Sequence, residues 1–196
     1  MRMPKKLILI IGPPGAGKST ECKLLTEKHK DDIDSYSVTN IIKEKIAENS
    51  AIGKIMNTYV LSGDLVPGDL IMHEVIDLIK NGSKDIVLMD GLPRGLNQMK
   101  TLGDAIHMDD NVQLVAVIKI KVSKETARKR RLTESATQEE IDIFEHKMDV
   151  YNDLLEEIEN YYKKDNLLTV IDGEKDSEAV VSDIDELLTK KVALFA

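Results

Sequence analysis

The chain has 196 residues, enough for one domain with a sizeable core, and its 42% apolar and 32% charged residues are ordinary for a soluble globular protein. A formal net charge of −8 disfavours binding to long nucleic acid, and a single cysteine excludes an intrachain disulfide and a cysteine-rich zinc site. No segment approaches the roughly 18 apolar residues of a membrane span, so we expect a cytoplasmic protein without membrane or nucleic-acid partners.

Strands and helices are expected to alternate along the chain. The apolar run of residues 7–11 predicts a strand buried on both faces, and residues 21–28 predict a helix. Further strands are expected at residues 36–38, 85–89, 112–120 and 167–171. Further helices are expected at residues 40–49, 51–61, 70–79, 97–106, 124–132, 137–162 and 177–188, with a loop at 62–69. This alternation predicts an α/β protein, a three-layer α/β/α sandwich with a central parallel sheet of about five strands.

Residues 12–20 lie between the first strand and the first helix and contain the G-x-x-x-x-G-K-[ST] pattern. Its glycines let backbone N–H groups close around a phosphate, and the following helix directs its positive N-terminal end at the same phosphate. Lys18 is expected to bind the β and γ phosphates, and Ser19 to ligate Mg²⁺. The pattern predicts a nucleoside triphosphate site of the P-loop NTPase type. Its expected phosphate-binding residues are Gly12, Pro13, Gly15, Ala16, Gly17, Lys18, Ser19 and Thr20.

A second motif follows the strand expected at residues 85–89. Asp90 comes directly after the apolar run, where many proteins with a phosphate loop keep an acid for Mg²⁺ or its water shell. Arg94 follows in a loop stiffened by Pro93, and its guanidinium is expected to form a fork on a phosphate that Lys18 does not reach. The alternatives are an aspartate in an ordinary turn and an arginine on the surface. Since ligands of such folds bind at the carboxyl ends of the strands, we expect both motifs at one edge of the sheet.

Four segments together resemble the adenylate kinase family. They are residues 12–20, Gly63-Asp64-Leu65-Val66-Pro67, Asp90-Gly91-Leu92-Pro93-Arg94 with Gln98, and Ile171-Asp172-Gly173, in the order and spacing of that family. The first segment is shared by many families, whereas its combination with the third is much more specific. The resemblance covers nearly the whole chain and is to short-lid bacterial members. It implies a single P-loop kinase domain over residues 1–196, with a helical monophosphate-binding flap at 39–80 and a very short lid at 132–138.

The same resemblance implies a nucleoside monophosphate kinase that acts as a monomer and reversibly transfers the γ-phosphoryl group of Mg-ATP to AMP, giving two ADP. Arg94 would bind the phosphate of the monophosphate, Gln98 would read its base, and Asp90 would order the Mg²⁺ water shell. Arg130 would pack on the ATP base at the hinge of the lid, and Gly173 would belong to the same ATP site. The implied monophosphate-binding residues are Thr39, Lys43, Leu65, Val66, Gly91, Arg94 and Gln98. The implied catalytic residues are Lys18, Arg94, Arg130 and Lys147, and the implied metal ligands are Ser19 and Asp90.

Several positions depart from the family pattern. Lys43 and Lys147 stand where the family usually has arginine, so the charge remains but the bidentate fork is lost. Asn40 replaces an acid near the metal, and Glu134 replaces the second arginine of the lid hinge. Residues 132–139 contain no counterpart of the lid arginine or of the Asp-Asp pair that usually follows it.

These departures leave alternatives open, because transition-state arginines in phosphoryl transfer contribute roughly 10³ to 10⁵ in rate. Arg128, Arg131 or Lys147 could supply the missing charge, or residues 128–131 could be a solvated basic helix end. The alternative functions are a catalytically weakened nucleotide-binding or regulatory module and a P-loop kinase for a different monophosphate or small-molecule acceptor.

Two side chains outside the motifs carry expectations about burial. Cys22 lies on the first helix and is expected to be a small buried residue rather than a reactive thiol. His29 stands between two lysines and is expected to be exposed to solvent. The other histidines, at positions 73, 107 and 146, show no metal-ligand spacing.

Overall fold

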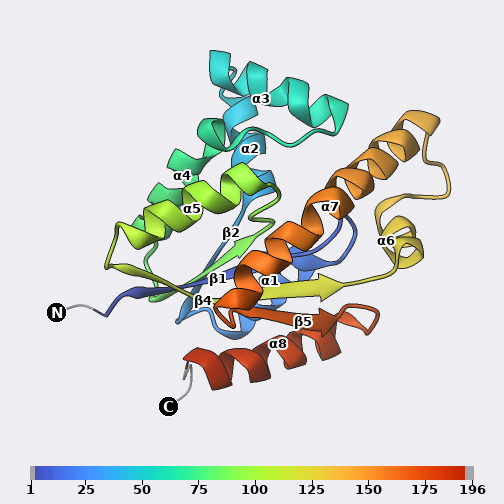
Figure 1. Ribbon diagram of the computed structural model, residues 1–196. Coiled ribbons are helices and arrows are strands. Elements are labelled where there is room, and N and C mark those ends of the chain that lie inside the picture. Colours follow the sequence, from blue (N-terminus) through green and yellow to red (C-terminus); the bar gives the residue numbers. More distant parts are fainter. Residues whose placement is uncertain (1–2, 193–196) are drawn as a thin grey trace.

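The computed structural model describes residues 3–192, in which a five-stranded parallel sheet is flanked by helices (Figure 1). The strands are β1 (Lys5–Ile11), β2 (Ile33–Ser37), β3 (Ile86–Asp90), β4 (Val112–Lys121) and β5 (Leu168–Asp172). The helices are α1 (Lys18–Lys28), α2 (Val38–Ala47), α3 (Ala51–Ser62), α4 (Gly68–Asn81), α5 (Leu96–His107), α6 (Lys124–Arg131), α7 (Gln138–Lys164) and α8 (Ser177–Val192). The strand order across the sheet is β2-β3-β1-β4-β5.

The side chains of β1 alternate between two buried cores, because successive residues of a strand point to opposite faces of the sheet. Leu9 belongs to a core with Leu102 of α5 and with residues of α4 and α7. Ile10 belongs to a second core with Leu25 of α1 and Ile184 of α8. In Figure 1, α5 and α7 lie on one side of the sheet and α8 on the other. The expected three-layer α/β/α sandwich is confirmed.

Two neighbouring strands in the middle of the sheet send their following helices to opposite faces. Strand β1 pairs with β3, with Ile10 in register with Asp90. The chain leaves β1 into α1, on the face of the second core, and leaves β3 toward α5, on the face of the first core. The two connections therefore separate at the carboxyl edge of the sheet, the kind of place where ligands of open α/β folds bind.

Most expected elements agree with the structure within about two residues, the usual uncertainty of element ends. The strand expected at residues 36–38 is present but begins and ends earlier, because β2 spans Ile33–Ser37 and Val38 already begins α2. As an edge strand β2 has half-exposed polar residues, so it lacks the apolar run that marks a central strand. Helix α4 begins at Gly68, inside the expected loop. Helix α1 begins at Lys18, so the last residues of the phosphate-loop motif form its first turn.

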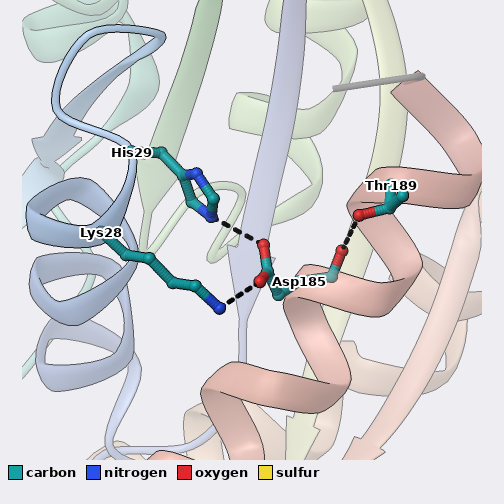
Figure 2. A network of polar contacts seen from close by, with 4 residues as sticks. All are labelled: Lys28, His29, Asp185 and Thr189. Carbon is teal, nitrogen blue, oxygen red and sulfur yellow. Dashed lines mark hydrogen bonds and ion pairs between the residues drawn. The ribbon is translucent and has the colours of Figure 1, made fainter. Parts of the chain in front are cut away.

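The expectation that His29 is exposed is wrong. His29 is only 8% exposed, and its Nε2 is hydrogen-bonded to Asp185 Oδ1 of α8 at 2.7 Å. Lys28 pairs with the other oxygen of the same carboxylate, and Thr189 Oγ1 donates to the Asp185 carbonyl at 2.9 Å (Figure 2). The end of α1 is thereby tied to α8, a contact between segments far apart in the chain. Cys22 is buried as expected, and burial raises the pKa of its thiol.

Capping residues fix the starts of α6 and α7. Ser123 Oγ accepts a hydrogen bond from the Thr126 N–H at 3.1 Å, as expected for an N-cap. Thr137 and Glu140 form the predicted capping box, with reciprocal hydrogen bonds between side chain and backbone. Within residues 3–192, no helix is both long and apolar enough to cross a membrane.

Candidate active site

The phosphate-loop motif lies at the carboxyl end of β1 and closes against α6. Lys18 Nζ donates to the carbonyl oxygens of Gly12 and Pro13, each at 2.9 Å. Gly15 has a φ of 81°, and a Cβ at this residue would lie 2.2 Å from the backbone oxygen of Ala127 in α6. Both the left-handed conformation and the lack of space require glycine at this position. The loop is therefore held between α1 and α6.

Burial lowers the pKa of Lys18 to about 8, the Arg94 charge acts in the same direction, and the Asp90 carboxylate partly opposes them. An anionic partner stabilises the charged form of such an ammonium group more than it stabilises that of an exposed one, because water screens the attraction less. Because its present partners are two neutral carbonyl oxygens, a phosphate at the N-terminus of α1 would stabilise its charged form.

Asp90 and Ser19 come together from β3 and α1. Ser19 Oγ donates a short hydrogen bond to Asp90 Oδ2. Asp90 is 2% exposed, and its Oδ1 has no hydrogen-bond partner within the described part of the chain. A hydroxyl and a carboxylate with a free oxygen fit Mg²⁺, which binds oxygen ligands and keeps several waters and substrate phosphates. Residues 3–192 contain no group of three or more His, Cys, Asp or Glu side chains that would hold a metal by themselves.

The loop after β3 fixes the Arg94 guanidinium. Arg94 Nε donates to the Gly91 carbonyl at 2.8 Å, and Nη2 donates to Thr39 Oγ1 of α2 at 2.8 Å. Gly91 has a φ of 77°, and a Cβ there would lie 2.4 Å from Arg94 Nη2. Burial lowers the pKa of Arg94 and the Asp90 charge opposes this, while an arginine stays protonated at any pH of interest. The charge of Arg94 thus lies close enough to Lys18 to lower the pKa of Lys18.

Gln98 joins the Arg94 loop to the connection between α3 and α4. Its Oε1 accepts from the Arg94 N–H at 2.9 Å, and its Nε2 donates to the Val66 carbonyl at 3.2 Å. Gln98 is 4% exposed and Val66 is buried, whereas Leu65 is half-buried. The structure brings these four predicted residues together. One N–H of the Gln98 amide remains beyond these two bonds for a ligand.

Arg130 and Gly173 lie on the other side of the phosphate loop. Arg130 Nη1 donates to the Ala16 carbonyl at 3.4 Å, and Nη2 donates to the Lys175 carbonyl at 3.5 Å. The N–H of the buried Gly173 donates to the Lys121 carbonyl at 2.8 Å. Helix α6 and the turn after β5 are therefore joined to the phosphate loop through Arg130.

The two predicted lysines are placed differently. Lys147 is half-buried on α7, and burial, Arg131 and Arg94 all lower its pKa, in that order of size. The charges of Arg131 and Arg94 therefore both act on Lys147. Lys43 is exposed on α2 and forms no hydrogen bond or ion pair with other described residues, so the structure does not join it to the other predicted residues. Glu134 is also exposed, in the short connection between α6 and α7.

Glu21 is a neighbour of the site that the sequence analysis missed. It lies in the first turn of α1, is 2% exposed, and accepts a long hydrogen bond from Ser177 Oγ of α8 at 3.4 Å. Its carboxylate packs against Gly17, where a Cβ would lie 2.6 Å from Oε1. Burial raises the pKa of Glu21. Its only sequence signal was its place in the first turn of the helix, which does not predict burial.

Comparisons with known proteins agree on one family. The family model described as "Adenylate kinase" matches residues 10–167. An adenylate kinase of Sulfurovum sp. is 37% identical over 196 residues, which cover 96% of this chain and 100% of the relative. Adenylate kinases of Helicobacter hepaticus and Nautilia profundicola are 35% and 34% identical, and the alignments cover 96% and 97% of this chain and 100% of each relative.

Proposed function

The chain belongs to the adenylate kinase family, and on that premise we propose how its residues carry out phosphoryl transfer between ATP and AMP. The reaction uses ATP and Mg²⁺. The bond from the γ-phosphorus to the β–γ bridging oxygen breaks, and a bond to a phosphate oxygen of AMP forms, so the products are two ADP. The observation that carries the assignment of residues is the cluster at one edge of the sheet, where Lys18, the Ser19–Asp90 pair and Arg94 meet.

The residues around the phosphate loop bind the ATP side. Backbone N–H groups at the N-terminus of α1 and the Lys18 ammonium bind the phosphate oxygens. Ser19 and Asp90 would hold a hydrated Mg²⁺, which would balance charge on the phosphates. Arg130, whose guanidinium is held by carbonyls on both sides, packs on the ATP base.

The residues around Arg94 bind the AMP side. Arg94 binds the AMP phosphate through its fork, which Thr39 and Gly91 orient. Gln98, which is fixed by the Val66 carbonyl, reads the base with its remaining N–H. Leu65 and Val66 line the base pocket. Lys147 binds the phosphates from α7, and Lys43 reaches them when α2 closes.

Two segments move in this proposal. Residues 39–80 close over AMP as a flap, and residues 132–138 close over ATP as a short lid, so that water is excluded from the transferring group. A lid this short covers less of the site and allows more ATP hydrolysis than a long one. We further propose a cytoplasmic monomer. The single cysteine, which is buried, is compatible with a reducing compartment, and size-exclusion chromatography with light scattering tests the monomer.

The proposed function is tested by a coupled assay of Mg-ATP with AMP, CMP, UMP, GMP and dTMP in parallel. We expect the highest kcat/KM with AMP and two ADP for each ATP consumed. Turnover without any monophosphate, subtracted from each value, measures hydrolysis by the open site.

Preference for another monophosphate would contradict AMP as the acceptor and would assign specificity to Thr39 and Gln98. No turnover with any of the five, while ATP binding persists in calorimetry, would overturn the kinase function and favour a nucleotide-binding module. The bisubstrate mimic with two adenosines joined by five phosphates gives an independent reading, because only two adjoining adenylate sites bind it tightly.

A further inference from the structure

The two exposed arginines of α6 that flank Arg130 differ in their partners. Arg128 Nη1 donates to Glu145 Oε1 of α7 at 2.8 Å, and Lys124 pairs with the other oxygen of that carboxylate. Arg131, one helical turn later, is exposed and has no hydrogen bond or ion pair with any residue between 3 and 192. The Arg128 charge is therefore already neutralised on the protein, whereas the Arg131 charge is not.

The position of α6 places Arg131 beside the site. Ala127 is fully buried against Phe144 and Met148 of α7, and its carbonyl lies against Gly15 of the phosphate loop. Arg131 follows Ala127 by four residues, so the two lie on one face of α6. The last turn of α6 thus extends from a contact with both the phosphate loop and α7.

The charge of Arg131 acts on Lys147 of α7, another residue predicted for the site. Burial lowers the pKa of Lys147, and the charges of Arg131 and then Arg94 lower it further. No carboxylate among the described residues pairs with Lys147 or Arg131. Lys147 thus feels the charges of two arginines in a chain whose net charge is −8, although like charges near each other are costly. A polyphosphate between them would relieve that repulsion.

We propose that Arg131 is a catalytic residue of this chain, contacting the transferring phosphoryl group together with Lys147 and Arg94. The inference rests on the proposed kinase function and deepens it. Charge spreads over the three equatorial oxygens of the transferring group, and a planar guanidinium binds two such oxygens at once. Since the connection between α6 and α7 contains no arginine, Arg131 supplies from the helix end the charge that the lid does not.

The test compares Arg131→Met with Arg128→Met, because both arginines are exposed on the same helix. We expect Arg131→Met to lower kcat at least 100-fold, with the KM values for ATP and AMP changed less than about threefold. Arg131→Lys should recover part of kcat, since it restores the charge without the fork. Arg128→Met should leave kcat within about threefold, because Lys124 still pairs with Glu145. Thermal melting of each variant shows whether a loss of kcat reflects folding.

The outcomes separate this inference from the proposed function. If the wild-type chain turns over AMP, Arg94→Ala loses at least about 100-fold in kcat and Arg131→Met keeps the wild-type kcat, the role of Arg131 is overturned and the kinase function stands. An equal loss of kcat in Arg128→Met would also overturn it, since a general effect of helix charge would then explain the data. If the wild-type chain is inactive with all five monophosphates, both proposals fail together. Weaker binding of the five-phosphate mimic to Arg131→Met, with unchanged ATP binding, would support the inference independently of turnover.

Discussion

The predicted site residues at the ends of β1 and β3 are bound to or buried in the backbone around them, whereas those on α6 and in its connection to α7 are exposed. Asp90 and Gln98 are almost inaccessible, and Lys18 and Arg94 are bound to neighbouring carbonyl oxygens. Glu134 and Arg131, by contrast, are exposed. Groups that bind phosphate throughout the reaction are more effective when the surrounding structure holds them in a fixed position. In the proposed function, the groups that act on the transferring phosphoryl approach it after the substrates have entered, and an exposed segment leaves room for that approach.

The largest loss of kcat is expected from a substitution in the phosphate loop. Lys18→Ala should lower kcat by at least 10³-fold, because the phosphates lose their lysine. The protein should stay folded, because the substitution removes a charge that is costly to keep in this partly buried place. The coupled assay and circular dichroism measure the two effects. Lys23→Ala is the matched control, since Lys23 lies on the same helix but is 76% exposed. Retained turnover in Lys18→Ala would remove the phosphate loop from the reaction.

Arg94→Ala should lower kcat about 10² to 10³-fold and raise the KM for AMP at least tenfold, with the KM for ATP little changed. Thr39→Val keeps the guanidinium and loses only its hydroxyl partner, so its effect should stay below about tenfold. Steady-state kinetics with each substrate varied in turn separate the two. Wild-type values of kcat and KM in Arg94→Ala would show that Arg94 takes no part in AMP binding or in the reaction.

The stability of the fold beneath the phosphate loop also depends on the contacts of Lys28 and His29, at the end of α1, with Asp185 of α8. Asp185→Asn should lower the free energy of unfolding by about 1 to 3 kcal/mol, whereas Asp183→Asn, on a more exposed pair of the same helix, should change it by less than about 1 kcal/mol. Burial alone would raise the pKa of Asp185, but hydrogen bonds from Lys28 and His29 lower it. Its stabilisation is therefore complete above the unfolded-chain pKa of about 3.9 and is lost as the pH falls through the lower folded value. Urea unfolding at pH 7 and near pH 3.5 should show the difference shrink; a constant difference would contradict the charge pair.

Substitutions in the connection between α6 and α7 should change kcat by smaller factors, which depend on the charge introduced. Glu134→Arg replaces an exposed negative charge by a guanidinium and should raise kcat up to about tenfold. Glu134→Gln, which only removes the charge, should give a smaller increase. A slower Glu134→Arg enzyme would mean that this residue does not face the phosphates.

The smallest effect is a proton taken up on ATP binding. Phosphates at the loop favour charged Lys18, so binding should raise its pKa from about 8, and up to one proton should be taken up between about pH 8 and 10. Calorimetry at pH 8.5 in two buffers of different ionisation enthalpy should give different binding enthalpies for the wild type and a smaller difference for Lys18→Met. Equal enthalpies for the wild type would show that Lys18 does not change its protonation.

The sequence determined the order of elements, the phosphate loop and the acid after β3, because these depend on local patterns. An apolar run of five residues predicts a buried strand, and glycine spacing predicts a loop that can approach phosphate. The local pattern misplaced the ends of the edge strand β2, because a strand paired on one side tolerates polar residues. It was wrong about His29, which is buried although its two neighbours in sequence are lysines.

Only the tertiary structure decided which charges are neutralised. Arg128 and Arg131 are equivalent in the basic run of α6, and one meets Glu145 of α7 while the other does not. Likewise, Thr39 orients Arg94, and Asp185 reaches His29, across 55 and 156 positions of chain. Partners this distant leave no periodic signal in the sequence, because the packing of separate elements rather than the spacing of residues brings them into contact.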